Sequence, residues 1–281
     1  MAETQPPPIW RPAELASFLS IHGLTPSRRL SQNFLIDGNI VRKIVATAAL
    51  EPGTPVLEIG SGPGALTQEI LSRGAKLIAV EKDERLASLL KRFQTPDERL
   101  HVIAGDILDL SLSELPPIGT PLTLIANLPY HLTTPIIVAL LPHYPLIKRM
   151  ILMVQDEVAR RLTSLPGTQE WGSISLFTRL YCHPSYAFKV SRHSFLPVPN
   201  VDSAIITLDL HPPLLDPVDP LLTLTRLAFQ HRRKQLRVSL KPLYPSTTID
   251  QALVAIGRDY RTRPEELSPE EFIALLRQLQ P

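Results

Sequence analysis

Short apolar segments alternate with amphipathic ones along the first 210 residues, and this alternation constrains the fold most strongly. Apolar segments with the character of buried strands occur at residues 55–60, 76–81, 100–106, 121–129 and 149–155. Between them lie helical patterns, such as residues 65–74 and 83–93. This order predicts an α/β fold with a mostly parallel sheet covered by helices on both faces. Residues 185–190 and 203–210 are predicted as two further strands, which could form an antiparallel pair.

The strand pattern stops at the proline-rich stretch of residues 211–220, and short helical patterns follow it. A chain of 281 residues is long for one domain and short for three. We therefore expect an N-terminal extension with a helix at residues 1–27, an α/β domain at 28–212 and a small helical domain at 213–281.

Composition excludes several classes of protein. With one cysteine, Cys182, the sequence has no intramolecular disulfide and no cysteine-based metal cage. No run approaches about 18 apolar residues, and the opening "MAETQPPPIWRP" lacks the apolar core of a signal peptide. We therefore expect no metal, no membrane span and a reducing, cytoplasmic setting.

Polar or glycine residues follow each of the first four predicted strands. They are Gly60, Gly62 and Gly64 after the first, Glu81 after the second, Asp106 after the third and Asn127 after the fourth. Parallel sheets bind ligands at the carboxyl ends of their strands, so these residues are expected at one rim. Taken singly, the glycines could form a tight turn and the acids could cap helices. Together they favour a nucleoside site, because Glu81 follows Gly60 at the spacing of a ribose-binding acid.

The segment Asn127-Leu128-Pro129-Tyr130 narrows the chemistry. The amide oxygen of Asn127 and the carbonyl of Leu128 could accept both N–H bonds of an adenine amine, favouring the geometry in which that amine attacks a methyl group. Pro129 would fix the turn, and Tyr130 would stack on an extruded base. An ordinary strand-terminating turn is the alternative. A nicotinamide dinucleotide is disfavoured because "GSGPG" lacks the G-x-G-x-x-G spacing.

Six segments resemble the ribosomal RNA adenine N6,N6-dimethyltransferases, which modify two adjacent adenines near the 3′ end of small-subunit rRNA. They are "SQNFLID" (31–37), "EIGSGPGALT" (58–67), "NLPYHLTTP" (127–135), "VQDEVARRL" (154–162), "FLPVPNVDSAIITL" (195–208) and "FQHRRKQLRVSL" (229–240). The resemblance implies a class I Rossmann-like methyltransferase domain with a seven-stranded sheet, an all-helical C-terminal domain and S-adenosylmethionine as cofactor.

The same resemblance implies roles for individual residues. The cofactor would be bound by Asn33, Leu35, Gly60, Gly62, Glu81, Asp106 and Asn127, with Glu81 on the ribose hydroxyls and Asp106 on the adenine amine. The target base would contact Asn127, Leu128, Pro129, Tyr130 and Phe195. Phe195 would stack opposite Tyr130; without the resemblance it would be interpreted as a core aromatic residue. The expected partner is 16S rRNA in an immature small subunit, bound by a monomer.

Residues 226–241 hold six basic residues and no acidic one, which favours contact with RNA. The expected RNA-binding residues are Arg232, Arg233, Lys234 and Arg237. If this block formed one helix, Arg226, Arg233 and Arg237 would share a face.

Three positions depart from the family pattern. Ser31 replaces a usual glycine, proline does not directly follow Gly60, and Val238 replaces a common asparagine. Alternative functions are a large-subunit rRNA adenine methyltransferase of the macrolide-resistance type, a binding or assembly factor on the same scaffold, and a DNA adenine methyltransferase.

Overall fold

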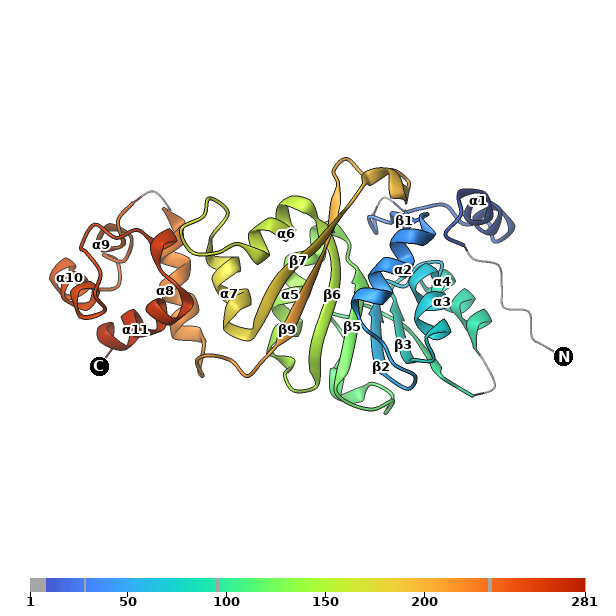
Figure 1. The fold of residues 1–281 in the computed structure, drawn as a ribbon, viewed down its shortest axis with the longest axis horizontal. Coiled ribbons are helices and arrows are strands. Elements are labelled where there is room, and N and C mark those ends of the chain that lie inside the picture. Colours follow the sequence, from blue (N-terminus) through green and yellow to red (C-terminus); the bar gives the residue numbers. More distant parts are fainter. Residues whose placement is uncertain (1–8, 28, 95–96, 232–233, 281) are drawn as a thin grey trace. The chain divides into compact units, whose positions relative to one another are not determined.

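The computed structural model describes residues 9–27, 29–94, 97–231 and 234–280 (Figure 1). The chain divides into two compact units. The first comprises Met1–Ala159 and Ser185–Leu210, and the second comprises Arg160–Pro184 and His211–Pro281. Residues 160–184 therefore group with the C-terminal helices, whereas the sequence analysis assigned them to the α/β domain.

A seven-stranded sheet forms the centre of the first unit, in the order β4-β3-β2-β5-β6-β9-β7. Its strands are β2 (Pro55–Ile59), β3 (Lys76–Glu81), β4 (Leu100–Ala104), β5 (Leu122–Asn127), β6 (Ile147–Gln155), β7 (Cys182–Val190) and β9 (Ser203–Leu210). The five strands from β4 to β6 run parallel, and β9 is antiparallel to β6. The predicted mostly parallel, seven-stranded α/β fold is confirmed.

The first unit also contains several helices. They are α1 (Pro12–Ile21), α2 (Gly38–Thr47), α3 (Ala65–Ser72), α4 (Glu84–Leu90) and α5 (Thr133–Leu140), while α6 (Asp156–Thr163) begins in this unit. Helices α3 and α4 contact β3, and α2 packs against α3 (Figure 1). Most residues of β2, β3 and β5 are buried, as expected for parallel strands covered on both faces.

A two-stranded antiparallel ribbon lies outside the main sheet. It pairs β1 (Phe34–Leu35) with β8 (Phe195–Leu196), so that Leu35 lies opposite Phe195. Residues more than 150 positions apart in the sequence thereby meet, and the ribbon joins the segment after α1 to the segment before β9.

The described part of the second unit is helical apart from the first residues of β7. Its helices are α7 (Ser173–Tyr181), α8 (Asp219–Gln230), α9 (Leu236–Ser239), α10 (Ser246–Ala255) and α11 (Pro269–Leu279). A capping box between Ser268 and Glu271 starts α11. The rings of Phe229 and Phe272 lie 5.8 Å apart between α8 and α11.

The single helix considered for residues 226–241 is wrong. Helix α8 ends at Gln230, because His231 adopts φ −129° and ψ 68°, which cannot continue a helix. Lys234 donates its backbone N–H to the carbonyl of His231, and α9 begins at Leu236. Arg226 and Arg237 therefore lie on different helices. Arg232 and Arg233 lie outside the described residues.

Within the described ranges, no helix is long and apolar enough to cross a membrane. The same ranges contain no cluster of three His, Cys, Asp or Glu residues that could hold a metal ion.

Candidate active site

The register of three parallel strands places the predicted site residues side by side. Ile59 of β2 pairs with Val80 of β3 on one side and with Ala126 of β5 on the other. The next residue along each strand is Gly60, Glu81 or Asn127. Since paired residues of parallel strands advance together, these three lie next to one another at the carboxyl edge of the sheet.

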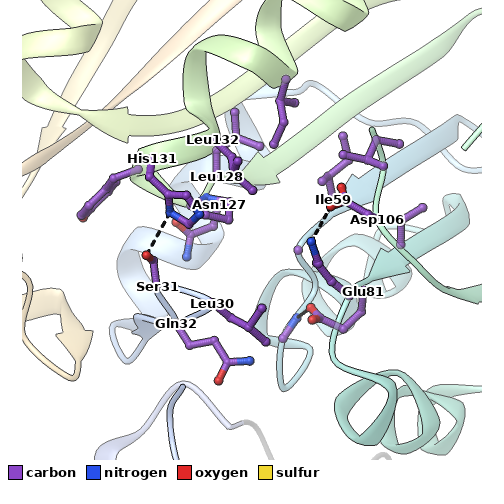
Figure 2. A pocket seen from close by; sticks show the side chains of 18 of the residues that line it. Leu30, Ser31, Gln32, Ile59, Glu81, Asp106, Asn127, Leu128, His131 and Leu132 are labelled. Atoms are coloured by element: carbon purple, nitrogen blue, oxygen red, sulfur yellow. Dashed lines mark hydrogen bonds and ion pairs between the residues drawn. The ribbon is translucent and has the colours of Figure 1, made fainter. Parts of the chain in front are cut away.

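A cavity of about 360 Å³ opens at this edge (Figure 2). It is lined by Arg29, Leu30, Ser31, Gln32, Asn33, Phe34, Ile59, Gly60, Gly62, Val80, Glu81, Lys82, Gly105, Asp106, Ile107, Asn127, Leu128, Pro129, Tyr130, His131, Leu132 and Ile136. Nine of the eleven cofactor-binding and catalytic residues expected from the sequence are in this set. Leu35 and Phe195 are not.

The glycines after β2 give a ligand close access to the backbone. Gly60 and Gly62 have φ values of 73° and 55°, in the left-handed region that favours glycine. A Cβ atom on Gly60 would lie 3.3 Å from the carbonyl oxygen of Asn127, so any larger residue would crowd the junction of β2 and β5. This turn has the open backbone that a nucleoside cofactor requires.

Glu81 is held rigidly at one wall of the cavity. Its Oε2 accepts the backbone N–H of Gly62 at 2.7 Å, and its Oε1 accepts that of Asp83 at 2.8 Å. Burial raises the pKa of Glu81, and the two N–H donors offset this only in part. A fixed carboxylate with remaining lone pairs suits the two hydroxyl groups of a ribose.

Asp106 lies across the cavity from Asn127 (Figure 2), and two contacts hold its carboxylate in place. Its Oδ2 lies 2.6 Å from Nζ of Lys82, and its Oδ1 accepts the N–H of Leu108 at 3.0 Å. Burial alone would raise the pKa of Asp106, but Lys82 and the N–H of Leu108 together lower it. Lys82 thus shares the carboxylate that the resemblance assigns to an adenine amine, and that assignment stays a prediction.

The side chain of Asn127 has a defined orientation. Its Nδ2 donates to the carbonyl oxygen of Asn33 at 3.2 Å, which leaves Oδ1 as the acceptor end of the amide. The turn that follows is a short 3-10 helix, Tyr130–Leu132. The hydroxyl of Tyr130 lies 2.9 Å from Oγ of the buried Ser203, which fixes the ring at the edge of the cavity.

Phe195 and Leu35 occupy a different environment. They are 1% and 4% exposed, belong to the same hydrophobic cluster and are paired in the β1–β8 ribbon. The expected stacking by Phe195 and the expected cofactor contact of Leu35 stay predictions. The sequence analysis did not identify Lys82, Gln32 or His131 as site residues, although His131 directly follows the Asn127–Tyr130 segment.

A family model described as "Ribosomal RNA adenine dimethylase" matches residues 24–280. The chain belongs to this family. It is therefore an S-adenosylmethionine-dependent rRNA adenine methyltransferase, as the sequence motifs indicated.

Curated relatives cover nearly the whole chain. A ribosomal RNA small subunit methyltransferase A from Protochlamydia amoebophila is 48% identical over 97% of this chain and 98% of its own length. The protein of the same name from Chlamydia muridarum is 41% identical over 95% of this chain and 96% of its own length.

Two solved structures are similar to this chain over most of its length. A dimethyladenosine transferase from Plasmodium falciparum has a TM-score of 0.75 and 27% identity, covering 86% of this chain and 95% of its own. The 23S rRNA methyltransferase ErmE has a TM-score of 0.70 and 30% identity, covering 89% and 100%.

A second buried acid, Glu58, lies on β2 just before the glycine turn. Glu58 of β2 is 1% exposed, and its Oε2 accepts the hydroxyl of Thr67 at 2.6 Å. Burial raises the pKa of Glu58 from 4.5 to about 7, and the nearby charge of Glu81 adds to the increase. Glu58 therefore binds a proton in the folded protein under conditions in which it is ionised in the unfolded chain.

The raised pKa of Glu58 predicts how stability depends on pH. Between pH 4.5 and 7 the folded state binds more protons than the unfolded state, so this group's contribution to stability is lost as the pH rises. In Glu58→Gln that loss is absent. From pH 5 to 8, the free energy of unfolding of Glu58→Gln relative to the wild type should increase by up to roughly 3 kcal/mol.

Urea denaturation across this pH range measures the effect, and Glu51→Gln, at an exposed position, controls for loss of one carboxylate. A difference between Glu58→Gln and the wild type that stays constant with pH would contradict the prediction.

The position of Glu81 predicts its contribution to cofactor binding. Glu81→Ala should weaken S-adenosylmethionine binding by about 1.5–3 kcal/mol, because it removes a charged acceptor of hydrogen bonds. Glu81→Gln, which keeps one acceptor oxygen, should lose less. Titration calorimetry on folded variants measures both, with the exposed Glu84→Ala as control. Unchanged affinity in folded Glu81→Ala would refute the assignment.

Proposed function

We propose that this chain transfers methyl groups to N6 of two adjacent adenines in the 3′-terminal hairpin of 16S rRNA, giving N6,N6-dimethyladenosine. We further propose that it acts as a monomer in the cytoplasm, on an immature small subunit. The observation that carries the proposal is the convergence of Gly60, Glu81 and Asn127 on one cavity, with Tyr130 at its edge. The relatives named small subunit methyltransferase A supply the choice of subunit.

In this reaction the main task of the protein would be to orient and activate the target amine. When bound, S-adenosylmethionine supplies a methyl group that is activated because its leaving group departs neutral. The adenine amine is a poor nucleophile, since its lone pair is delocalised into the ring. Oδ1 of Asn127 and the carbonyl of Leu128 would accept its N–H bonds and favour the tetrahedral geometry that attacks. The proton is then lost from a strongly acidic ammonium, so no strong general base is required.

The target adenine has to leave its stack to reach this cavity. A base in a hairpin loop does so at low cost, and the ring of Tyr130 offers it a stacking surface. The bond between Tyr130 and Ser203 would hold that ring in place. A monomethylated amine keeps one N–H, so it can be held again for the second transfer.

RNA binding is assigned to the helical C-terminal domain. Arg237 forms an ion pair with Asp250 at 3.2 Å and lies 5.7 Å from the ring of Tyr260, and Lys234 precedes it in the same basic block. Arg232 and Arg233 belong to the same proposal but lie outside the described residues. Together these cations would contact phosphates and position the hairpin.

A second candidate function is methylation of a large-subunit adenine. The similarity to ErmE favours it, because that protein is a 23S rRNA methyltransferase of related fold. The identity of 30% to ErmE is lower than the 41–48% to the small-subunit relatives, so the small-subunit function is preferred.

A substrate comparison tests the proposal. Purified immature small subunits, large subunits and free rRNA are each incubated with labelled cofactor, and methylated adenines are mapped by mass. We expect label at two adjacent adenines of the small subunit, with two methyl groups on each, and none in small subunits that already carry them. Label in large subunits alone would support the second candidate. The absence of label from every substrate would support a binding factor.

A further inference from the structure

Three consecutive residues connect the two sides of the cofactor cavity. Ser31 contacts His131, Gln32 contacts Asp83, and the carbonyl of Asn33 accepts the side chain of Asn127. Asn127 is the last residue of β5 and His131 lies in the 3-10 turn Tyr130–Leu132 that follows, whereas Asp83 follows β3. We call residues 31–33 the strap. All three line the cavity, and Figure 2 shows Ser31 and Gln32 across from Glu81 and Asp106.

The backbone of Ser31 adopts a conformation that is unusual for a serine. Ser31 has φ 51°, a left-handed conformation that costs free energy for any residue other than glycine. Glycine would adopt this conformation without strain. A serine here gains a side-chain contact that glycine lacks: its Oγ lies 3.0 Å from Nδ1 of His131 (Figure 2).

This contact is the shortest of the three in the strap. The bonds of Gln32 to Asp83 and of Asn127 to Asn33 are 3.4 Å and 3.2 Å long. We call residues 127–130, which are proposed to hold the target base, the catalytic turn. His131 immediately follows Tyr130, so the Ser31 bond ties the strap directly to this turn. The serine hydroxyl can donate or accept, so the bond can form with either tautomer of the His131 ring and with its protonated form.

We infer that Ser31 and His131 are positioning residues that form a clasp, which holds the strap closed over bound S-adenosylmethionine. The closed strap keeps the carbonyl of Asn33 against Nδ2 of Asn127, and so keeps Oδ1 of Asn127 available to the target amine. The clasp slows release of the cofactor. This inference rests on the cofactor and on the catalytic turn of the proposed function.

The clasp matters because dimethylation consumes one cofactor for every methyl group. The spent cofactor has to leave before the next transfer, so the strap has to open between transfers. A bond between two partly exposed side chains is weak enough to break repeatedly, and it changes the rate of opening without contributing much to the stability of the fold.

A double-mutant cycle tests the clasp on the complex of protein and cofactor alone. The dissociation rate of S-adenosylmethionine is measured by stopped flow for the wild type, Ser31→Gly, His131→Ala and the double variant. Each single variant should release the cofactor about 2- to 10-fold faster, the range for one hydrogen bond. The double variant should release it no faster than the single variants.

Two further readouts separate a clasp from a general structural role. The thermal midpoint of Ser31→Gly should not fall, because glycine relieves the strain at φ 51°. His131→Asn should keep slow release, since its amide places a polar atom near the position of Nδ1. Independent, multiplying effects in the double variant, or wild-type release rates in both single variants, would overturn the inference. RNA is absent from these measurements, so their outcome is separate from that of the subunit comparison.

Discussion

The site depends on the register of β2 between β3 and β5. Ile59 pairs with Val80 and with Ala126, and this alignment brings Gly60, Glu81 and Asn127 together one residue later. The register is fixed by apolar side chains on both faces of the sheet, since a slip of one residue would reverse which face each side chain occupies. The hydrophobic core therefore positions the polar chemistry.

Nearby hydrogen-bond donors and one lysine partly offset the cost of burying carboxylates at this edge of the sheet. Burial raises the pKa of Glu58 and of Glu81, and the nearby charge of Glu81 raises the pKa of Glu58 further. The backbone N–H groups of Gly62 and Asp83 compensate Glu81, and Lys82 compensates Asp106. A site built in this way carries a stability cost in its buried carboxylates, in exchange for acceptors that are fixed before the cofactor arrives.

The sequence predicted the parts of the molecule that local patterns specify. Apolar periodicity located the strands, and the polar residue after each strand located the rim that contains Glu81 and Asn127. It did not predict that the block from Arg226 to Lys241 divides into two helices, because the break depends on the backbone of His231. Nor did it predict the strap: the bonds of Ser31 to His131 and of Asn33 to Asn127 join residues 100 and 94 positions apart, and no periodic pattern encodes such pairs.

If the amide of Asn127 orients the target amine, its removal should slow methyl transfer, and single-turnover kinetics of Asn127→Ala measure that effect. The reaction is run with immature small subunits and saturating cofactor, with RNA affinity measured separately and the exposed Asn39→Ala as control. We expect a transfer rate lower by roughly 100-fold or more, with RNA affinity close to that of the wild type. A transfer rate within a few fold of the wild type would contradict it.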